Sequence, residues 1–276
     1  MKIADLFKVD GYGVVVTGAA SGLGLGFTEA LAENGARVTM LDVNPQRISD
    51  ETKRLKAAGL DVRGKVVDVT DHSALDKAFD EAFATYGRLD VVFANAGIDS
   101  GPGFISGWVG EQRPRVAEGA IENYTDERWE RVIDINLNGV FATIRAAARH
   151  MKPRKSGRII VTTSLAAIVP ESAVGAAYMA AKAGAAHLMH NVALELAAYN
   201  ITVNAIAPGF FVTNIGGGHA HNPALQEAVS KSVPMHRVGF PKDMHGLALF
   251  LSSPASAYIT GQQIVIDGGW GLGTAD

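Results

Sequence analysis

The regular alternation of short apolar runs with longer helical patterns constrains the fold of this chain most. Short apolar runs are expected to form strands at 13–17, 37–42, 62–68, 89–94, 158–163, 202–207 and 263–267. Their near-continuous apolarity is typical of strands buried on both faces of a sheet. Helical patterns lie between them at 23–34, 45–58, 72–86, 126–151, 174–199 and 241–251. This alternation indicates right-handed βαβ units, so we expect an α/β fold with a doubly wound parallel sheet of about seven strands and helices on both faces.

The chain is expected to form a single domain over residues 1–276, because no Pro/Ser-rich linker divides it. Two stretches interrupt the alternation, one near 98–124 and the other near 210–223. Each follows a predicted strand. Loops beyond the carboxyl ends of parallel strands form the ligand crevice of open α/β sheets, so both stretches are predicted to line the substrate site.

Charge and composition exclude several classes of function. The net charge is −3 and no basic run occurs, which argues against nucleic acid or an anionic membrane as a partner. The chain has no cysteine, so disulfides, thiolate metal sites and cysteine nucleophiles are excluded. No apolar run reaches membrane-spanning length, and the first residues do not form a signal-like segment. We therefore expect a cytoplasmic protein that binds no membrane.

A glycine-rich turn follows the first predicted strand and opens the first helix. Such a turn lets the backbone approach a pyrophosphate, and the helix N-terminus supplies N–H groups and positive dipole. The residues predicted to contact the cofactor here are Gly18, Ser21, Gly22, Leu23 and Gly24. The spacing differs from the commoner Gly-x-Gly-x-x-Gly, and a plain tight turn is the alternative interpretation.

Asp42 ends the second predicted strand, about 20 residues after the glycines, where a carboxylate can accept hydrogen bonds from a ribose 2′-OH. It would repel a 2′-phosphate, and no Arg or Lys occupies positions 19–22 or 42–46. The sequence therefore favours NAD over NADP. The alternative is that Asp42 caps the following helix.

Tyr178 and Lys182 lie four residues apart in a segment rich in helix-forming residues, which places them on one helical face. A nearby cation favours the phenolate, so Lys182 is expected to lower the pKa of Tyr178. A tyrosine tuned in this way can exchange a proton with an alcohol or carbonyl.

Taken together, these motifs resemble the classical short-chain dehydrogenase/reductase family over nearly the whole chain, with its Rossmann-type fold. The resemblance implies that Asn136, Ser164, Tyr178 and Lys182 are catalytic, with Asn136 ordering a water and Lys182 holding the nicotinamide ribose. It also implies a homotetramer. Further cofactor contacts are implied for Asp68 and Val69 at the adenine, for Asn95, Ala96 and Gly97 after the fourth strand, and for Pro208, Gly209 and Thr213 at the nicotinamide carboxamide.

The sequence departs from the family pattern at three points. Ala94 stands where Asn is common, the 98–124 loop is long, and the Ser164 to Tyr178 separation is one residue longer than the commonest spacing. Thr163 is therefore the alternative for the serine role.

The predicted function is hydride transfer between NAD and a small, mainly apolar secondary alcohol or ketone, with Tyr178 as general acid/base and Ser164 donating to the substrate oxygen. The alternatives are a 3-oxoacyl-type carbonyl reductase, an NAD-retaining epimerase or dehydratase, and a non-catalytic NAD-binding protein. A polar or anionic substrate stays open, because the first loop carries Glu111, Arg113, Arg115 and Glu118.

Histidines and aromatic residues in the two loops allow more than one interpretation. His219 and His221 lack further ligands nearby in the sequence, so no metal site is expected and a substrate contact is an alternative. Aromatic side chains either line the pocket or pin the loops: Phe104, Trp108, Phe210 and Phe211.

Overall fold

The computed structural model describes residues 2–105 and 113–273, and its centre is one parallel sheet. The strand order is β3-β2-β1-β4-β5-β6-β7, and neighbours pair in parallel. The strands are β1 (Gly13–Thr17), β2 (Arg37–Asp42), β3 (Val62–Val66), β4 (Val91–Ala94), β5 (Gly157–Thr162), β6 (Ile201–Pro208) and β7 (Gln263–Ile266). The predicted doubly wound sheet is confirmed.

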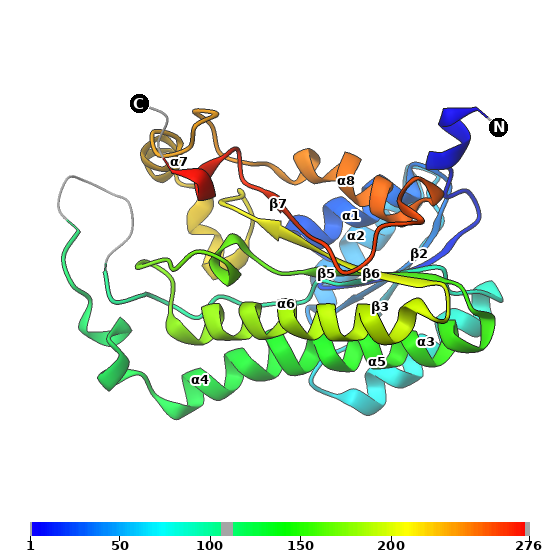
Figure 1. Cartoon of the computed structure of the whole chain (residues 1–276), viewed down its shortest axis with the longest axis horizontal. Coiled ribbons are helices and arrows are strands. Elements are labelled where there is room, and N and C mark those ends of the chain that lie inside the picture. The colour runs from blue at the N-terminus through cyan, green and yellow to red at the C-terminus, as the bar shows by residue number, and fades with distance from the viewer. Residues whose placement is uncertain (1, 106–112, 274–276) are drawn as a thin grey trace.

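Helices cover both faces of the sheet (Figure 1). One face packs α1 (Gly22–Ala32), α2 (Pro45–Ala57) and α8 (His245–Ser252), and the other packs α3 (His72–Tyr86), α5 (Gly139–Met151) and α6 (Ala176–Ala197). The described residues also form α4 (Asp126–Ile133) and α7 (Pro223–Ser230), which are as short as α8. No helix in the described part of the chain combines the length and apolarity that crossing a membrane requires.

Two apolar clusters, one on each face of the sheet, fix the position of the helices that carry the site. On the α1 face, Phe27 stacks on Phe93 with ring centroids 4.6 Å apart. On the other face, α6 buries Ala177, Ala181 and Ala185, which recur at i+4 along one side of the helix. These small alanine side chains let α6 approach the sheet closely. Tyr178 and Lys182, which follow Ala177 and Ala181 on the helix, therefore lie near the ends of the central strands.

The predicted helix at 126–151 is interrupted. It forms α4, a π-helical turn over Asp134–Asn138, and α5. Single π-turns inside helices occur often at functional sites, and this one carries the buried Asn136. The second loop is also followed by a helix that was not expected. The segment Ile215–His221 turns through left-handed backbone at Gly216, Gly217 and Gly218 and leads to α7, which the Asn222 side chain caps by accepting from the Ala224 N–H.

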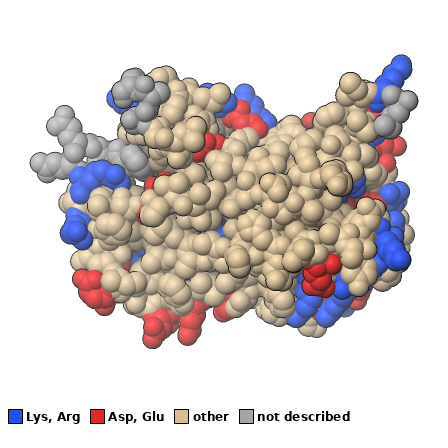
Figure 2. All heavy atoms as spheres, in the orientation of Figure 1, with Lys and Arg blue, Asp and Glu red and all other residues tan. Residues whose placement is uncertain are grey.

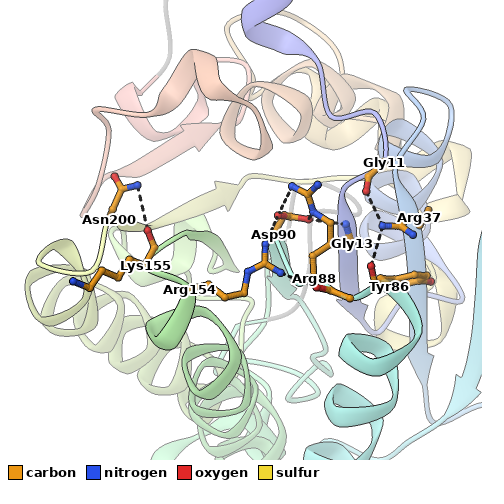
Figure 3. A network of polar contacts seen from close by, with 10 residues as sticks. Gly11, Gly13, Arg37, Tyr86, Arg88, Asp90, Arg154, Lys155 and Asn200 are labelled. Atoms are coloured by element: carbon orange, nitrogen blue, oxygen red, sulfur yellow. Dashed lines mark hydrogen bonds and ion pairs between the residues drawn. The ribbon is translucent and has the colours of Figure 1, made fainter.

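A polar network fastens the sheet at the amino ends of its central strands (Figure 3). The buried Asp90 carboxylate accepts the Gly13 N–H at 2.8 Å and Arg88 Nε and Nη2 at 2.6 and 2.9 Å. Nearby, the Arg37 guanidinium donates to the carbonyls of Gly11 and Tyr86. Because this network lies before β1 and β4, it is at the opposite edge from the strand ends that form the cavity.

Candidate active site

A cavity of about 1280 Å³ opens at the carboxyl ends of β1, β4, β5 and β6. The sheet order reverses between β1 and β4, and ligands of open α/β sheets bind in this crevice. Every site residue predicted from the sequence lines the cavity except Asn136.

The glycine turn has the geometry of a tight anion cradle. A Cβ on Gly24 would lie 2.1 Å from the Gly18 carbonyl oxygen, and a Cβ on Gly18 would lie 2.9 Å from Ala96 Cα. Gly22 has a φ of 55°, which favours glycine. Ser21 is the N-cap of α1 but its side chain makes no capping hydrogen bond. The first N–H groups of α1 are thus left for a ligand, and the turn fits a dinucleotide pyrophosphate.

Asp42 holds the glycine turn and lines the cavity at the same time. Its Oδ2 accepts the Ala20 N–H at 2.9 Å, and its Oδ1 accepts the Asn44 N–H at 2.9 Å. Asn44 caps α2 by accepting the Arg47 N–H, so Asp42 does not cap that helix. Arg47 directly follows the 42–46 stretch, which contains no Arg or Lys. Its side chain is exposed and, like Asp42, lines the cavity.

Asn95 ties three strand ends together behind the cofactor site. Its Nδ2 donates to the carbonyls of Thr17 and Gly18 at 3.0 and 3.3 Å, and its Oδ1 accepts from Thr162 Oγ1 at 3.0 Å. This side chain therefore fixes the glycine turn of β1 relative to β5, and Ala96 and Gly97 line the cavity beside it.

The remaining predicted cofactor residues also pack into the cavity wall. Asp68 Oδ1 accepts both the backbone N–H and the hydroxyl of Thr70, and α3 is capped by Asp71 instead. Val69 packs closely against Gly139, because a Cβ added to Gly139 would lie 2.7 Å from Val69 Cγ2. Others that line the wall are Leu23, Pro208, Gly209 and Thr213, the last of which lies against Gly22.

Tyr178 and Ser164 meet at the centre of the cavity. Ser164 follows β5, and its Oγ accepts the Ala166 N–H at 3.2 Å and shares a hydrogen bond with Tyr178. Thr163 is committed elsewhere, since its hydroxyl donates to the Ile206 carbonyl at 3.0 Å and accepts from Gln263. The geometry therefore places Ser164 and not Thr163 beside the phenol.

The pKa of Tyr178 differs from the sequence-based expectation. Burial raises it to about 12; the hydrogen bond with Ser164 acts against this rise, and the charge of Asp99 adds to it. We expected Lys182 to lower this pKa, but the loss of hydration on burial outweighs any such effect. The phenol is therefore protonated at neutral pH.

Lys182 lies one helical turn after Tyr178 and is almost fully buried, with 3% of its surface exposed. Its Nζ donates to the Thr162 carbonyl at 2.8 Å and lies 5.6 Å from the centroid of the Tyr178 ring. Burial lowers the pKa of the ammonium to about 8. A cation held beside a phenol in this way stabilises negative charge that develops on the phenol.

Asn136 does not line the cavity, but it shapes the cavity from behind. Its Oδ1 accepts the Ile98 N–H at 2.8 Å, and its Nδ2 donates to the Ile98 carbonyl at 2.9 Å. A Cβ on Gly97 would lie 3.0 Å from Asn136 Oδ1 and 3.4 Å from Lys182 Nζ, so the three residues converge. The amide holds the start of the first loop, and its predicted water-ordering role stays a prediction.

The two loops have defined structure over the described residues. The first pairs with the segment before α6, because Gly103 and Ile105 donate to the carbonyls of Ala173 and Ser172 at 3.0 and 3.1 Å. Trp108 and Glu111 lie outside the described residues. Among the loop aromatics, Phe210 and Phe211 line the cavity, whereas Phe104 lies under the Arg115 guanidinium.

The loop histidines are held by local contacts. His219 lines the cavity with its Nδ1 2.8 Å from the Gly216 carbonyl oxygen, and His221 Nε2 lies 3.1 Å from Asn214 Oδ1. Over the described ranges, no three His, Cys, Asp or Glu side chains gather closely enough to hold a metal ion.

Sequence reasoning missed three residues that shape the substrate end. Asp99 and Glu171 both line the cavity. Arg128 reaches from α4 to donate to the carbonyls of Ser100, Pro102 and Glu118. The only available signal was the position of Asp99, just beyond a predicted strand end, where binding residues concentrate.

A dinucleotide cradle joined to a buried Tyr–Lys pair and a serine is the site of a nicotinamide-dependent oxidoreductase. The chain belongs to the short-chain dehydrogenase/reductase family. A family model described as enoyl-(acyl carrier protein) reductase matches residues 18–271. Named relatives of this chain are reductases and dehydrogenases that act on CH–OH groups or the matching ketones, and the family match covers almost all of the chain.

Relatives with known names have several different substrates. The chain is 33% identical to 3-oxoacyl-(acyl carrier protein) reductase FabG of Chlamydia pneumoniae, covering 93% of this chain and 95% of that protein. It is 30% identical to 5-keto-D-gluconate 5-reductase of Escherichia coli, with 96% and 97% covered. A gluconate 5-dehydrogenase structure from Burkholderia cenocepacia, in complex with NADP and tartrate, is 30% identical with a TM-score of 0.85 and 98% of each chain covered.

Proposed function

We propose that this protein is an NAD-dependent oxidoreductase that transfers a hydride between NAD and a small secondary alcohol or ketone. The observation that carries the proposal is that Tyr178, Ser164 and Lys182 converge on the same cavity as the glycine turn. Apolar side chains around them, such as Ile105 and Val174, support a substrate with a small apolar body.

Each residue has a role that follows from its contacts. A bound nicotinamide would supply the hydride acceptor for oxidation and the donor for reduction. In reduction, protonated Tyr178 gives its proton to the substrate oxygen, and Ser164 donates a hydrogen bond to that oxygen as charge develops. In oxidation, the substrate hydroxyl returns the proton to the Tyr178 oxygen, and the Lys182 ammonium stabilises the phenolate that this step requires.

NAD is proposed as the cofactor on electrostatic grounds. Among the described residues that line the cavity, seven are Asp or Glu and three are Lys or Arg. Asp42 lies where a 2′-phosphate would add two further negative charges. Among the cavity-lining residues that the structure describes, Arg47 is the cation next to Asp42 in the chain, and NADP binding would be gained through it if Asp42 were neutralised.

A 3-oxoacyl-type reductase is the second candidate. The observation that favours it is the 33% identity with FabG of Chlamydia pneumoniae. Reduction of a 3-oxoacyl thioester with NADPH at a higher kcat/KM than any simple ketone with NADH would establish it instead.

We also propose a homotetramer. Figure 2 shows a broad central area with few charged side chains, where α6 lies in Figure 1. Leu194 on α6 is 81% exposed and Phe141 on α5 is 45% exposed. Burial of such groups between subunits stabilises an assembly. A single monomer species in sedimentation at micromolar protein would refute the tetramer.

The test of the proposed activity is NADH absorbance over a panel of secondary alcohols and ketones, run with NAD(H) and NADP(H) in parallel. We expect turnover with NAD(H) that Tyr178→Phe removes. Turnover with NADP(H) alone would overturn the cofactor assignment, and turnover that survives Tyr178→Phe would overturn the site.

A further inference from the structure

Asp99 lies at the substrate end of the cavity and is held there from both sides. Ile98 before it has both backbone groups bound by the Asn136 amide. Ser100 after it has its carbonyl bound by Arg128 Nε at 2.5 Å and by the Tyr124 hydroxyl at 3.3 Å. A residue between two fixed neighbours presents its side chain at a defined place, which is what a binding group requires.

The Asp99 carboxylate has an acceptor available for a ligand. Its Oδ1 accepts the Ser100 N–H at 2.8 Å. In the parts of the chain that the structure describes, no donor is bound to Oδ2, and the side chain is partly exposed to the cavity. A Cβ on Gly216 would lie 3.0 Å from Oδ2 and 2.4 Å from His219 Cε1, so a side chain at position 216 would crowd both residues, and glycine leaves Oδ2 uncovered on that side.

The same part of the cavity is unfavourable for a negative charge. Glu171 lines it from the segment before α6, and burial raises the pKa of its carboxyl, with Arg113 acting in the opposite direction. Asp99 is near enough to Tyr178 for its charge to act on the phenol. Like charges that are partly buried in the same cavity repel, so a carboxylate on the substrate would be rejected.

We propose that the substrate is a neutral alcohol or ketone with a second hydroxyl, which donates a hydrogen bond to Asp99 Oδ2, and that Asp99 excludes substrates bearing a carboxylate. This inference rests on the proposed function, because it assumes that Tyr178 marks the reacting carbon. The contact with Asp99 adds one polar interaction to the mainly apolar substrate under the proposed function. It also separates this chain from the gluconate 5-dehydrogenase relative, whose structure holds tartrate, a dicarboxylate.

The test compares three probes on one scaffold: a vicinal cyclohexanediol, cyclohexanol and the matching vicinal hydroxy carboxylate. The readout is the ratio of kcat/KM for diol to cyclohexanol, because any effect of Asp99 on the pKa of Tyr178 cancels in that ratio. A hydrogen bond to a charged group changes kcat/KM by about 10- to 100-fold, so we expect the wild-type kcat/KM ratio of diol to cyclohexanol to be of that size. Asp99→Ala should remove the preference, and Asp99→Asn should raise the relative rate with the hydroxy carboxylate.

Glu122→Gln, an exposed carboxylate of the same loop, is the matched control and should leave the ratio unchanged. A diol preference that persists in Asp99→Ala, or a wild-type enzyme that favours the hydroxy carboxylate, would overturn the inference while leaving the proposed activity intact. No NADH formation with any probe or with the wider alcohol panel would count against the proposed function, and this inference would fail with it.

Discussion

Lys182 is predicted to lower the free energy of unfolding at neutral pH, although its charge stabilises the Tyr178 phenolate in the proposed reaction. A lysine whose pKa falls from 10.5 to about 8 on folding costs about 3 kcal/mol below pH 8. Because the folded pKa lies below the unfolded one, the unfolded chain binds more protons between about pH 8 and 10.5. The free energy of unfolding should therefore rise with pH in that window, and the cost is gone above it.

Lys182→Met is the perturbation that isolates this effect. It removes the buried charge but also the donor at 2.8 Å from the Thr162 carbonyl, which costs about 1–3 kcal/mol. The two terms nearly cancel at pH 7, so we expect a change in unfolding free energy of less than about 2 kcal/mol there. From pH 7 to 10, wild type should gain about 2.5 kcal/mol relative to the variant.

Urea unfolding at pH 7, 8, 9 and 10 without cofactor measures this difference, with Lys53→Met on the exposed side of α2 as control. Contributions from other groups are common to both proteins and cancel. A wild-type-minus-variant difference that stays flat from pH 7 to 10 would refute the lowered pKa, and with it the account of how Lys182 is held.

Three further changes test other parts of the structure. Asp42→Asn should raise kcat/KM with NADP(H) by about tenfold relative to NAD(H), since it leaves Arg47 unopposed; an unchanged cofactor ratio would argue against that role. Asp90→Ala should lower the free energy of unfolding by about 2–3 kcal/mol, because it leaves the Gly13 N–H buried without an acceptor; urea unfolding checks this, and kcat should be retained. Asn136→Ala should lower kcat by at least about tenfold with the fold retained by circular dichroism, because the Ile98 clamp is lost; wild-type kcat would contradict the clamp.

The sheet was predictable because its signal is local. The strand at 13–17 is a nearly continuous apolar run, the strand at 37–42 has an apolar centre, and the structural bounds of both agree with the expectation. The predicted helix at 126–151 failed at its centre because the break depends on a partner far along the chain, the Ile98 backbone that Asn136 binds. Periodicity carries no information about such a contact.

The site residues that belong to motifs at strand ends were predictable from the sequence. The pKa values and side-chain positions that depend on tertiary packing were not. Ser164 and Tyr178 meet in the cavity as the family resemblance implied, although their spacing is one residue longer than usual. The raised pKa of Tyr178 comes from burial, which the sequence does not show. Asp99 was missed because its importance arises from neighbours that fix it, Ile98 and Ser100, through side chains on α4 and the turn after it. Loops acquire function through tertiary contacts, and a single sequence does not place them.

Tyr178→Phe tests the central claim most directly. With NADH binding measured by fluorescence and turnover measured at saturating substrate, the account predicts that kcat falls by about 100- to 10,000-fold while the Kd for NADH stays within a few-fold of wild type. A kcat within a few-fold of wild type would contradict the assignment of Tyr178 as the group that exchanges the proton.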